Sequence, residues 1–113
     1  MPQRDPMVQL LHMKDYTRKA VEMAQGRERK HLNEDEMFQL ALTRLVELIG
    51  EAASHVQQGT RKNNSQIPWT KITGMRHRLI HEYDTVDLDI LWDTVKHDLP
   101  PLLTELEKIV GSA

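Results

Sequence analysis

The sequence contains no cysteine. A disulfide framework, a zinc–thiolate site and a thiol nucleophile are therefore excluded. Aromatic residues are also scarce, with one phenylalanine, two tryptophans and two tyrosines among 113 residues, so aliphatic side chains must build the core. No segment approaches the roughly 20 apolar residues of a membrane-spanning helix, and the N-terminus lacks the pattern of a signal peptide. These absences favour a cytoplasmic protein that folds as one domain over residues 1–113.

Acidic residues are missing from a long middle segment. Residues 52–81 contain no Asp or Glu, but they contain these basic residues and histidines: Arg61, Lys62, Lys71, Arg76, Arg78, His55, His77 and His81. The next segment, residues 82–98, reverses the sign, with six acidic residues against Lys96 alone. Because the net charge of the whole chain is −2, the pattern favours a local site for an anion such as phosphate over a general nucleic-acid coat. A solvated surface of chance composition is the alternative.

Apolar residues recur at helical spacing in the first half of the chain. We expect a helix over about residues 6–24 and a long second helix over about 34–57, with Asn33 as its N-cap and Glu36 completing a capping box. Leu40 and Val46 lie off the expected apolar stripe of the long helix, whose members are Phe38, Ala41, Leu42, Leu45, Leu48, Ile49, Ala52 and Val56. Gly50 and Ala53 are small enough for another helix to approach closely, although Gly50 could merely weaken the helix.

The second half is also predicted to be helical. After a polar loop over residues 58–66, Pro68 fits the first turn of a third helix that ends near His81. Asp87 is a good N-cap for a fourth helix, and the Pro100–Pro101 pair either kinks that helix or starts a fifth. No segment shows the alternation of a strand. The sequence therefore predicts an all-α, up-and-down bundle of four to five helices.

The candidate catalytic and modification residues, Arg76, His81 and Tyr83, lie at or just after the end of the segment without acidic residues. Arginine can grip a phosphate with two parallel hydrogen bonds, histidine can move a proton near neutral pH, and tyrosine offers a hydroxyl. RNA supplies its own nucleophile, the 2′-hydroxyl, so these groups could cleave it without a metal. His77 and Arg78 are candidates for positioning the substrate phosphate, or else plain surface residues.

The spacing of the motif raises a geometric problem. Residues five apart on an unbroken helix point about 140° away from each other, so Arg76 and His81 cannot share one face. The helix could stop before His81, the imidazole could swing around the helix end, or two chains could place their motifs opposite each other. Because one histidine cannot readily act as both base and acid in one step, we expect a two-fold homodimer with a shared cleft.

Each candidate also has a structural explanation. Arg76 could form an ion pair with Glu51 or Asp84, and Glu51 could alternatively orient Arg76 for substrate. His81 could be a cationic residue at a helix C-terminus, and Tyr83 a half-buried tyrosine. His77 and His81 have the i, i+4 spacing of helical metal ligands, but no Glu stands between them as in HExxH, so we expect no metal and no cofactor.

The ordered motifs resemble a known family. Arg76-x4-His81-x-Tyr83 is similar to the Rx4HxY signature of HepT-like toxins in the HEPN (higher eukaryote and prokaryote nucleotide-binding) superfamily. The resemblance extends over roughly residues 35–110, through residues 48–53 on the long helix, residues 67–69 and 74–75 before the motif, and residues 86–92 and 98–100 after it.

The resemblance implies an all-helical dimer that acts as a metal-independent RNase toxin. It implies a minimal nucleotidyltransferase antitoxin as partner, which attaches AMP to Tyr83 and silences the toxin. Added bulk and negative charge beside a phosphate-binding site would oppose RNA binding. The alternative is a non-catalytic module that binds a nucleotide or the nucleotidyltransferase and cleaves nothing.

Overall fold

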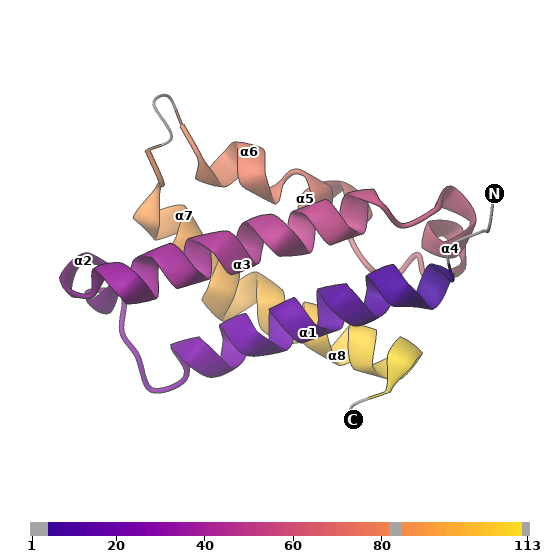
Figure 1. Ribbon diagram of the computed structural model, residues 1–113, viewed down its shortest axis with the longest axis horizontal. Helices are drawn as coiled ribbons and strands as arrows, with labels where there is room; N and C mark the ends of the chain where they lie inside the picture. Colours follow the sequence, from indigo (N-terminus) through magenta and orange to yellow (C-terminus); the bar gives the residue numbers. More distant parts are fainter. Residues whose placement is uncertain (1–4, 82–84, 112–113) are drawn as a thin grey trace.

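The computed structural model describes residues 5–81 and 85–111 of the chain. Its elements are all helical (Figure 1): α1 (Pro6–Ala24), α2 (His31–Glu34), α3 (Glu36–Ser54), α4 (Gln58–Asn63), α5 (Trp69–Thr73), α6 (Met75–Leu79), α7 (Leu88–Asp93), the π-helical segment η2 (Thr94–Asp98) and α8 (Leu99–Val110). The predicted all-α fold is confirmed. No helix in these described ranges is long and apolar enough to cross a membrane.

Aspartate side chains cap the N-termini of α1, α3 and α7. The carboxylate of Asp5 accepts a hydrogen bond from the Met7 amide at 2.9 Å at the start of α1. Asp35 caps α3 in the same way, through the Phe38 amide at 3.1 Å, and Asp87 caps α7. Each cap satisfies an amide that has no partner within its helix, which fixes where the helix begins.

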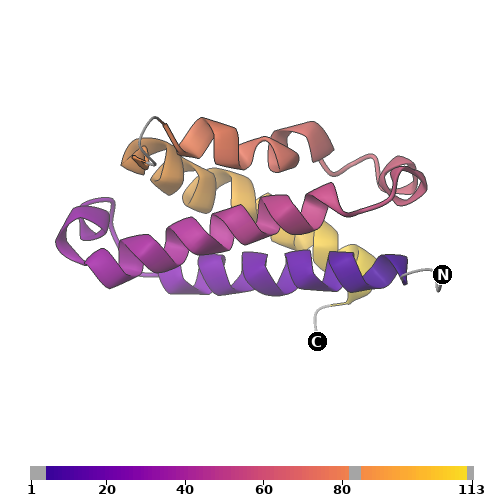
Figure 2. The same cartoon turned by 45° about the horizontal axis from the view of Figure 1, so that its top comes forward.

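The long helix α3 is the centre of the packing. It lies between α1 on one side and the α5–α6 segment on the other; α7 passes behind α3, and α8 packs against α1 (Figures 1 and 2). The hydrophobic side chains that are at most 1 % exposed come from every layer: Leu10, Met13, Ala20, Leu42, Val46, Ile49, Ala53, Ile67, Leu79, Leu91, Val95, Leu99 and Leu106. Aliphatic residues therefore build this core, as the shortage of aromatics predicts.

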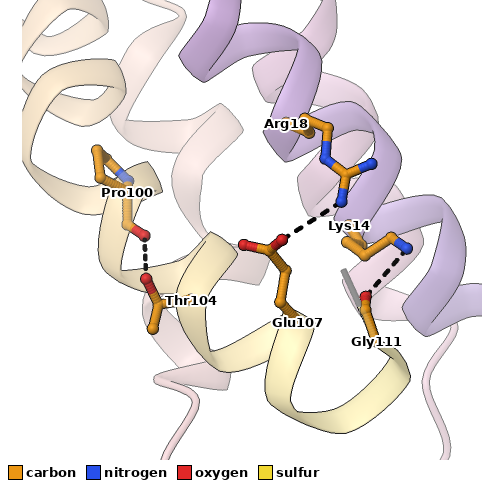
Figure 3. A network of polar contacts seen from close by, with 6 residues as sticks. All are labelled: Lys14, Arg18, Pro100, Thr104, Glu107 and Gly111. Atoms are coloured by element: carbon orange, nitrogen blue, oxygen red, sulfur yellow. Dashed lines mark hydrogen bonds and ion pairs between the residues drawn. The ribbon is translucent and has the colours of Figure 1, made fainter. Parts of the chain in front are cut away.

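Polar contacts tie the first helix to the last (Figure 3). Lys14 on α1 is only 2 % exposed, and its ammonium donates a hydrogen bond to the carbonyl of Gly111 at 3.2 Å. One turn later, Arg18 pairs with Glu107 on α8 at 3.4 Å. A cation at the C-terminal end of a helix meets carbonyls that lack intrahelical partners. Lys14 thus caps α8 from a helix almost 100 residues away in sequence.

Three predictions for α3 are corrected by the structure. Its N-cap is Asp35, whereas Asn33 lies inside the short helix α2, so the proposed capping box does not form. The helix runs from Glu36 to Ser54, which is shorter than predicted at both ends. Of the two apolar residues off the predicted stripe, Val46 is 1 % exposed and Leu40 is 57 % exposed. A helix with neighbours on several sides buries more of its circumference than one stripe.

Gly50 allows the close approach that the sequence predicts. A Cβ atom at this position would lie 3.2 Å from the carbonyl oxygen of Ile72 on α5. A real Cβ rarely comes that close to a backbone oxygen. The missing side chain therefore sets the distance between α3 and the segment that carries Arg76.

The second half is divided differently from the prediction. The expected loop over residues 58–66 contains α4, and the third helix is interrupted at Gly74, which separates α5 from α6. Leu99 donates its amide to the Thr94 carbonyl five residues back, which makes the π-helical turn η2. Pro100 and Pro101 then fall in the first turn of α8, where an amide hydrogen is not needed. The helical backbone nevertheless continues without a break from α7 through η2 into α8, so the result combines the two predicted outcomes, a disturbed helix and a last α-helix that begins beside the proline pair.

Candidate functional site

Arg76 lies on α6 and faces the middle of α3. Its Nε donates a hydrogen bond to the Glu47 carboxylate at 3.1 Å, and the Arg76 side chain is 54 % exposed. An ion pair this open to water adds little stability, so its main effect is to hold the guanidinium in place. Because the bond uses Nε, both terminal NH2 groups can still bind a phosphate. The observed partner is Glu47, whereas Glu51 was predicted; the other predicted partner, Asp84, lies outside the described residues.

A cleft of about 300 Å³ surrounds Arg76. α3 contributes Arg44, Glu47 and Glu51 to its wall, and His77 stands beside Arg76 on the opposite wall. Glu51 therefore belongs to the same cleft as Arg76, although Glu47 is the residue that bonds to it. Two glutamates balance the two arginines of this lining, so the cleft offers an anion the terminal NH2 groups of a guanidinium and no excess of positive charge.

His81 follows the end of α6. The helix stops at Leu79, Ile80 is extended, and Ile80 pairs with Val86 in a short antiparallel bridge. Two backbone hydrogen bonds hold this bridge, from the His81 amide to the Thr85 carbonyl at 2.8 Å and from the Asp87 amide to the Leu79 carbonyl at 2.8 Å. The first of the three predicted geometries, a helix that stops before His81, is therefore the observed one. His77 and His81 do not share a helix.

The imidazole of His81 faces the carboxylate that caps α7. His81 Nε2 lies 3.4 Å from Asp87 Oδ2, while Asp87 Oδ1 accepts the Ile90 amide at 3.0 Å. The hydrogen bond from the Ile90 amide is the main cause that holds the pKa of Asp87 below its ordinary value of 3.8, and the bond from His81 adds to it. An ionised carboxylate only accepts hydrogen bonds. In the neutral imidazole, Nε2 therefore carries the proton and Nδ1 is the atom free to take another.

Within one chain the structure does not bring the whole motif together. Among the described residues, the Arg76 cleft is lined by His77 but not by His81. Arg78 is exposed on α6 and is not part of the cleft lining. Tyr83 lies outside the described residues. Another cavity, of about 450 Å³ between α5 and α8, has a largely apolar lining that includes Ile67, Ile72, Met75, Leu99 and Leu102, and no predicted site residue lines it.

Comparison with known proteins decides the family. A family model described as "Ribonuclease HepT-like" matches residues 13–109. The chain belongs to the HepT-like ribonuclease family. The resemblance drawn from the motif is thereby confirmed, since the match spans the predicted site and all of α3 to α7.

Individual relatives agree with this assignment. The chain is 40 % identical over 75 residues to "Probable ribonuclease HepT" of Thermococcus cleftensis, covering 66 % of this chain and 68 % of that protein. It is 31 % identical over 110 residues to a protein of Methanocaldococcus jannaschii named "Putative RNase", covering 97 % and 91 %. A protein of Caldanaerobacter subterraneus subsp. tengcongensis, also named as a putative RNase, is 31 % identical over 107 residues, covering 95 % of this chain and 96 % of that protein. No solved structure is significantly similar.

Two site residues of this HepT-like chain escaped the sequence reasoning. Asp87 was identified as a helix cap, but its second oxygen faces His81. Glu47 was not singled out, although it stands four residues before Glu51 and thus on the same helix face. Neither contact leaves a local signal, because the partners are 6 and 29 residues apart in sequence.

Proposed function

We propose that this chain is a metal-independent RNase that acts as the toxin of a toxin–antitoxin pair. Arg76 holds the phosphate and stabilises the charge that develops on it, and His81 is the acid–base group. The observation that carries the proposal is the His81–Asp87 contact, because the carboxylate orients the imidazole and leaves Nδ1 free. Family membership supports the RNase activity.

The active form that we propose is a two-fold homodimer. Within one chain, Arg76 lines the Arg76 cleft, whereas His81 lies outside that lining and contacts Asp87. A second copy related by a two-fold axis would offer its own His81 to the Arg76 cleft, and the reverse. Arg78 would then add positive charge, and His77 a hydrogen-bonding ring, along the path of the RNA backbone.

RNA cleavage tests the proposal. The purified wild-type chain, kept in excess EDTA, should cleave single-stranded RNA, and His81→Ala should lower the rate by about 100-fold or more, as loss of a general acid–base group does. Arg76→Ala should also lower the rate. Arg29→Ala is a matched control, because Arg29 is a surface arginine that pairs with Asp89. Equal rates for wild type and His81→Ala would instead favour the non-catalytic module that binds a nucleotide or a nucleotidyltransferase.

Regulation by modification is the second part of the proposal. A minimal nucleotidyltransferase antitoxin would transfer AMP to the hydroxyl of Tyr83, two residues after His81. The added phosphate would compete with RNA phosphate for the same arginines. Intact mass after co-expression with the neighbouring nucleotidyltransferase gene should show AMP increments on wild type and none on Tyr83→Phe. An unmodified wild-type chain that still arrests growth would remove this part alone.

A further inference from the structure

A second groove, the α1–α3 groove, lies on the side of α3 that faces α1. It has a volume of about 250 Å³, with Gln9, His12 and Tyr16 on the α1 side and Leu48, Glu51 and His55 on the α3 side. Glu51 lines this groove and the Arg76 cleft alike. Because α3 lies between α1 and α5–α6 (Figures 1 and 2), the two sites open on neighbouring flanks of one helix.

His55 presents a fixed hydrogen-bond acceptor to this groove. α3 ends at Ser54, and the His55 amide donates to the carbonyls of Ala52 and Ala53. The imidazole Nδ1 lies 2.8 Å from the Glu51 carbonyl. A carbonyl oxygen only accepts, so Nδ1 carries a proton. The neutral ring therefore has its lone pair on Nε2, and the backbone bond sets its orientation.

Two rings stand one helical turn apart on the α1 wall. His12 is exposed and Tyr16 is half-buried, with ring centroids 6.2 Å apart and planes inclined by 45°. Aromatic and histidine rings are the usual stacking surfaces for unpaired RNA bases. The Gln9 amide and the Glu51 carboxylate add donors and acceptors for the edge of a base.

The two grooves differ in charge. The Arg76 cleft is lined by two arginines and two glutamates, whereas the described lining of the α1–α3 groove has Glu51 and no lysine or arginine. A phosphate favours the first and an uncharged, hydrogen-bonding ring the second. The volume of the α1–α3 groove lies just below the range of about 300–1,000 Å³ typical of small-molecule pockets, which suits a single nucleoside.

We infer that the α1–α3 groove is a base-binding subsite. It receives one nucleobase of the RNA whose backbone phosphate lies in the Arg76 cleft, through stacking on His12 or Tyr16 and hydrogen bonds to His55 Nε2, Gln9 and Glu51. This inference rests on the proposed RNase function, because that function supplies the RNA chain that joins the two sites.

A binding experiment tests the subsite without cleavage. The probe is an RNA dinucleotide with a 2′-O-methyl group at its linkage, titrated into the full-length chain while the imidazole signals of the histidines are followed by NMR. The signals of His12 and His55 should shift and saturate together, and those of His97 on η2 should not. An abasic version of the dinucleotide should leave His12 and His55 unchanged.

Matched variants give the second readout. His12→Ala should raise the Kd of the dinucleotide by about fivefold to 100-fold, the range for loss of a stacking partner. His97→Ala, also an exposed histidine, should leave it unchanged. Unshifted His12 and His55 signals, or full affinity in both His12→Ala and Tyr16→Ala, would overturn the inference.

The outcomes also separate the subsite from the proposed function. If the groove titrates with the dinucleotide but the wild-type chain cleaves no RNA, the subsite stands and the RNase proposal fails. If RNA is cleaved but the groove does not respond, the RNase proposal stands and the subsite is wrong.

Discussion

The side chain of Asp87 makes two contacts, one with each carboxylate oxygen. Oδ1 caps α7 through the Ile90 amide, and Oδ2 faces His81. The N-terminus of α7 therefore helps to position the imidazole of His81. A carboxylate held this way also stays charged to low pH, because hydrogen bonds to the ionised form lower its pKa.

Replacing Asp87 separates its two roles. Asparagine is an equally good N-cap, so Asp87→Asn should keep α7 but remove the charge that faces His81. RNA cleavage at neutral pH should fall by about tenfold, the effect of losing one modest interaction in the transition state. The control is Asp35→Asn, since Asp35 also caps a helix but lies beside Arg27. Cleavage by Asp35→Asn should match wild type, and equal loss in both variants would contradict the role assigned to Asp87.

The same variants have a defined pH signature. The pKa values of Asp35 and Asp87 are both lowered by hydrogen bonds from helix amides. A carboxylate with a lowered folded-state pKa stabilises the fold above its unfolded value of 3.8, and this contribution is lost as pH falls through the folded value. Thermal unfolding followed from pH 6 to pH 2 should therefore show a smaller acid-induced drop in Tm for either variant than for wild type.

Residue chemistry was more predictable than residue partners. The sequence identified Arg76 and His81 from chemical type, and Asp87 as a cap from the pattern after a turn. It could not identify Glu47 as the partner of Arg76, because that contact depends on how α6 lies across α3. Catalytic roles for Arg76 and His81, and modification of Tyr83, stay predictions.

At the scale of elements, Gly50 sets how α3 and α5 pack. Val at this position would press its side chain toward the Ile72 carbonyl. Overpacking of this kind costs about 1–3 kcal/mol, so Gly50→Val should lower the free energy of unfolding by that amount in urea denaturation. RNA cleavage should also fall, because α6 follows α5 directly and carries Arg76.

Gly59 provides the matched control. It lies on α4, where a Cβ atom would have nothing within 4 Å. Gly59→Val should therefore change the free energy of unfolding by no more than about 0.5 kcal/mol, the difference in helix propensity. Similar destabilisation in both variants would show that packing at Gly50 is not the cause.

Helix existence was predictable, and helix division was not. The start of α1 and its end at Ala24 follow from the apolar spacing and from Gly26, whose φ of 72° suits glycine. The break at Gly74 and the π-helical turn before Pro100 were missed. Both depend on a balance between local propensity and packing against α3 and α1, and a single sequence does not contain that balance.

At the scale of the molecule, the proposed dimer makes a quantitative prediction. If Arg76 of one protomer works with His81 of its partner, inactive Arg76→Ala and His81→Ala chains should complement each other when unfolded together and refolded. Half of the dimers would be mixed, and each mixed dimer would have one intact pair, so about a quarter of wild-type cleavage should return. The two variants kept in separate tubes are the control. No recovery, with mixed dimers confirmed by mass, would place each site within one chain.

The bond between Lys14 and Gly111 has a consequence for synthesis. α1 is made first, but its buried ammonium obtains this partner only when the ribosome has added a residue 97 positions later. The site residues lie between these two anchors in the chain. A nascent chain that stops before Gly111 therefore contains the whole motif but lacks this contact between α1 and the end of α8.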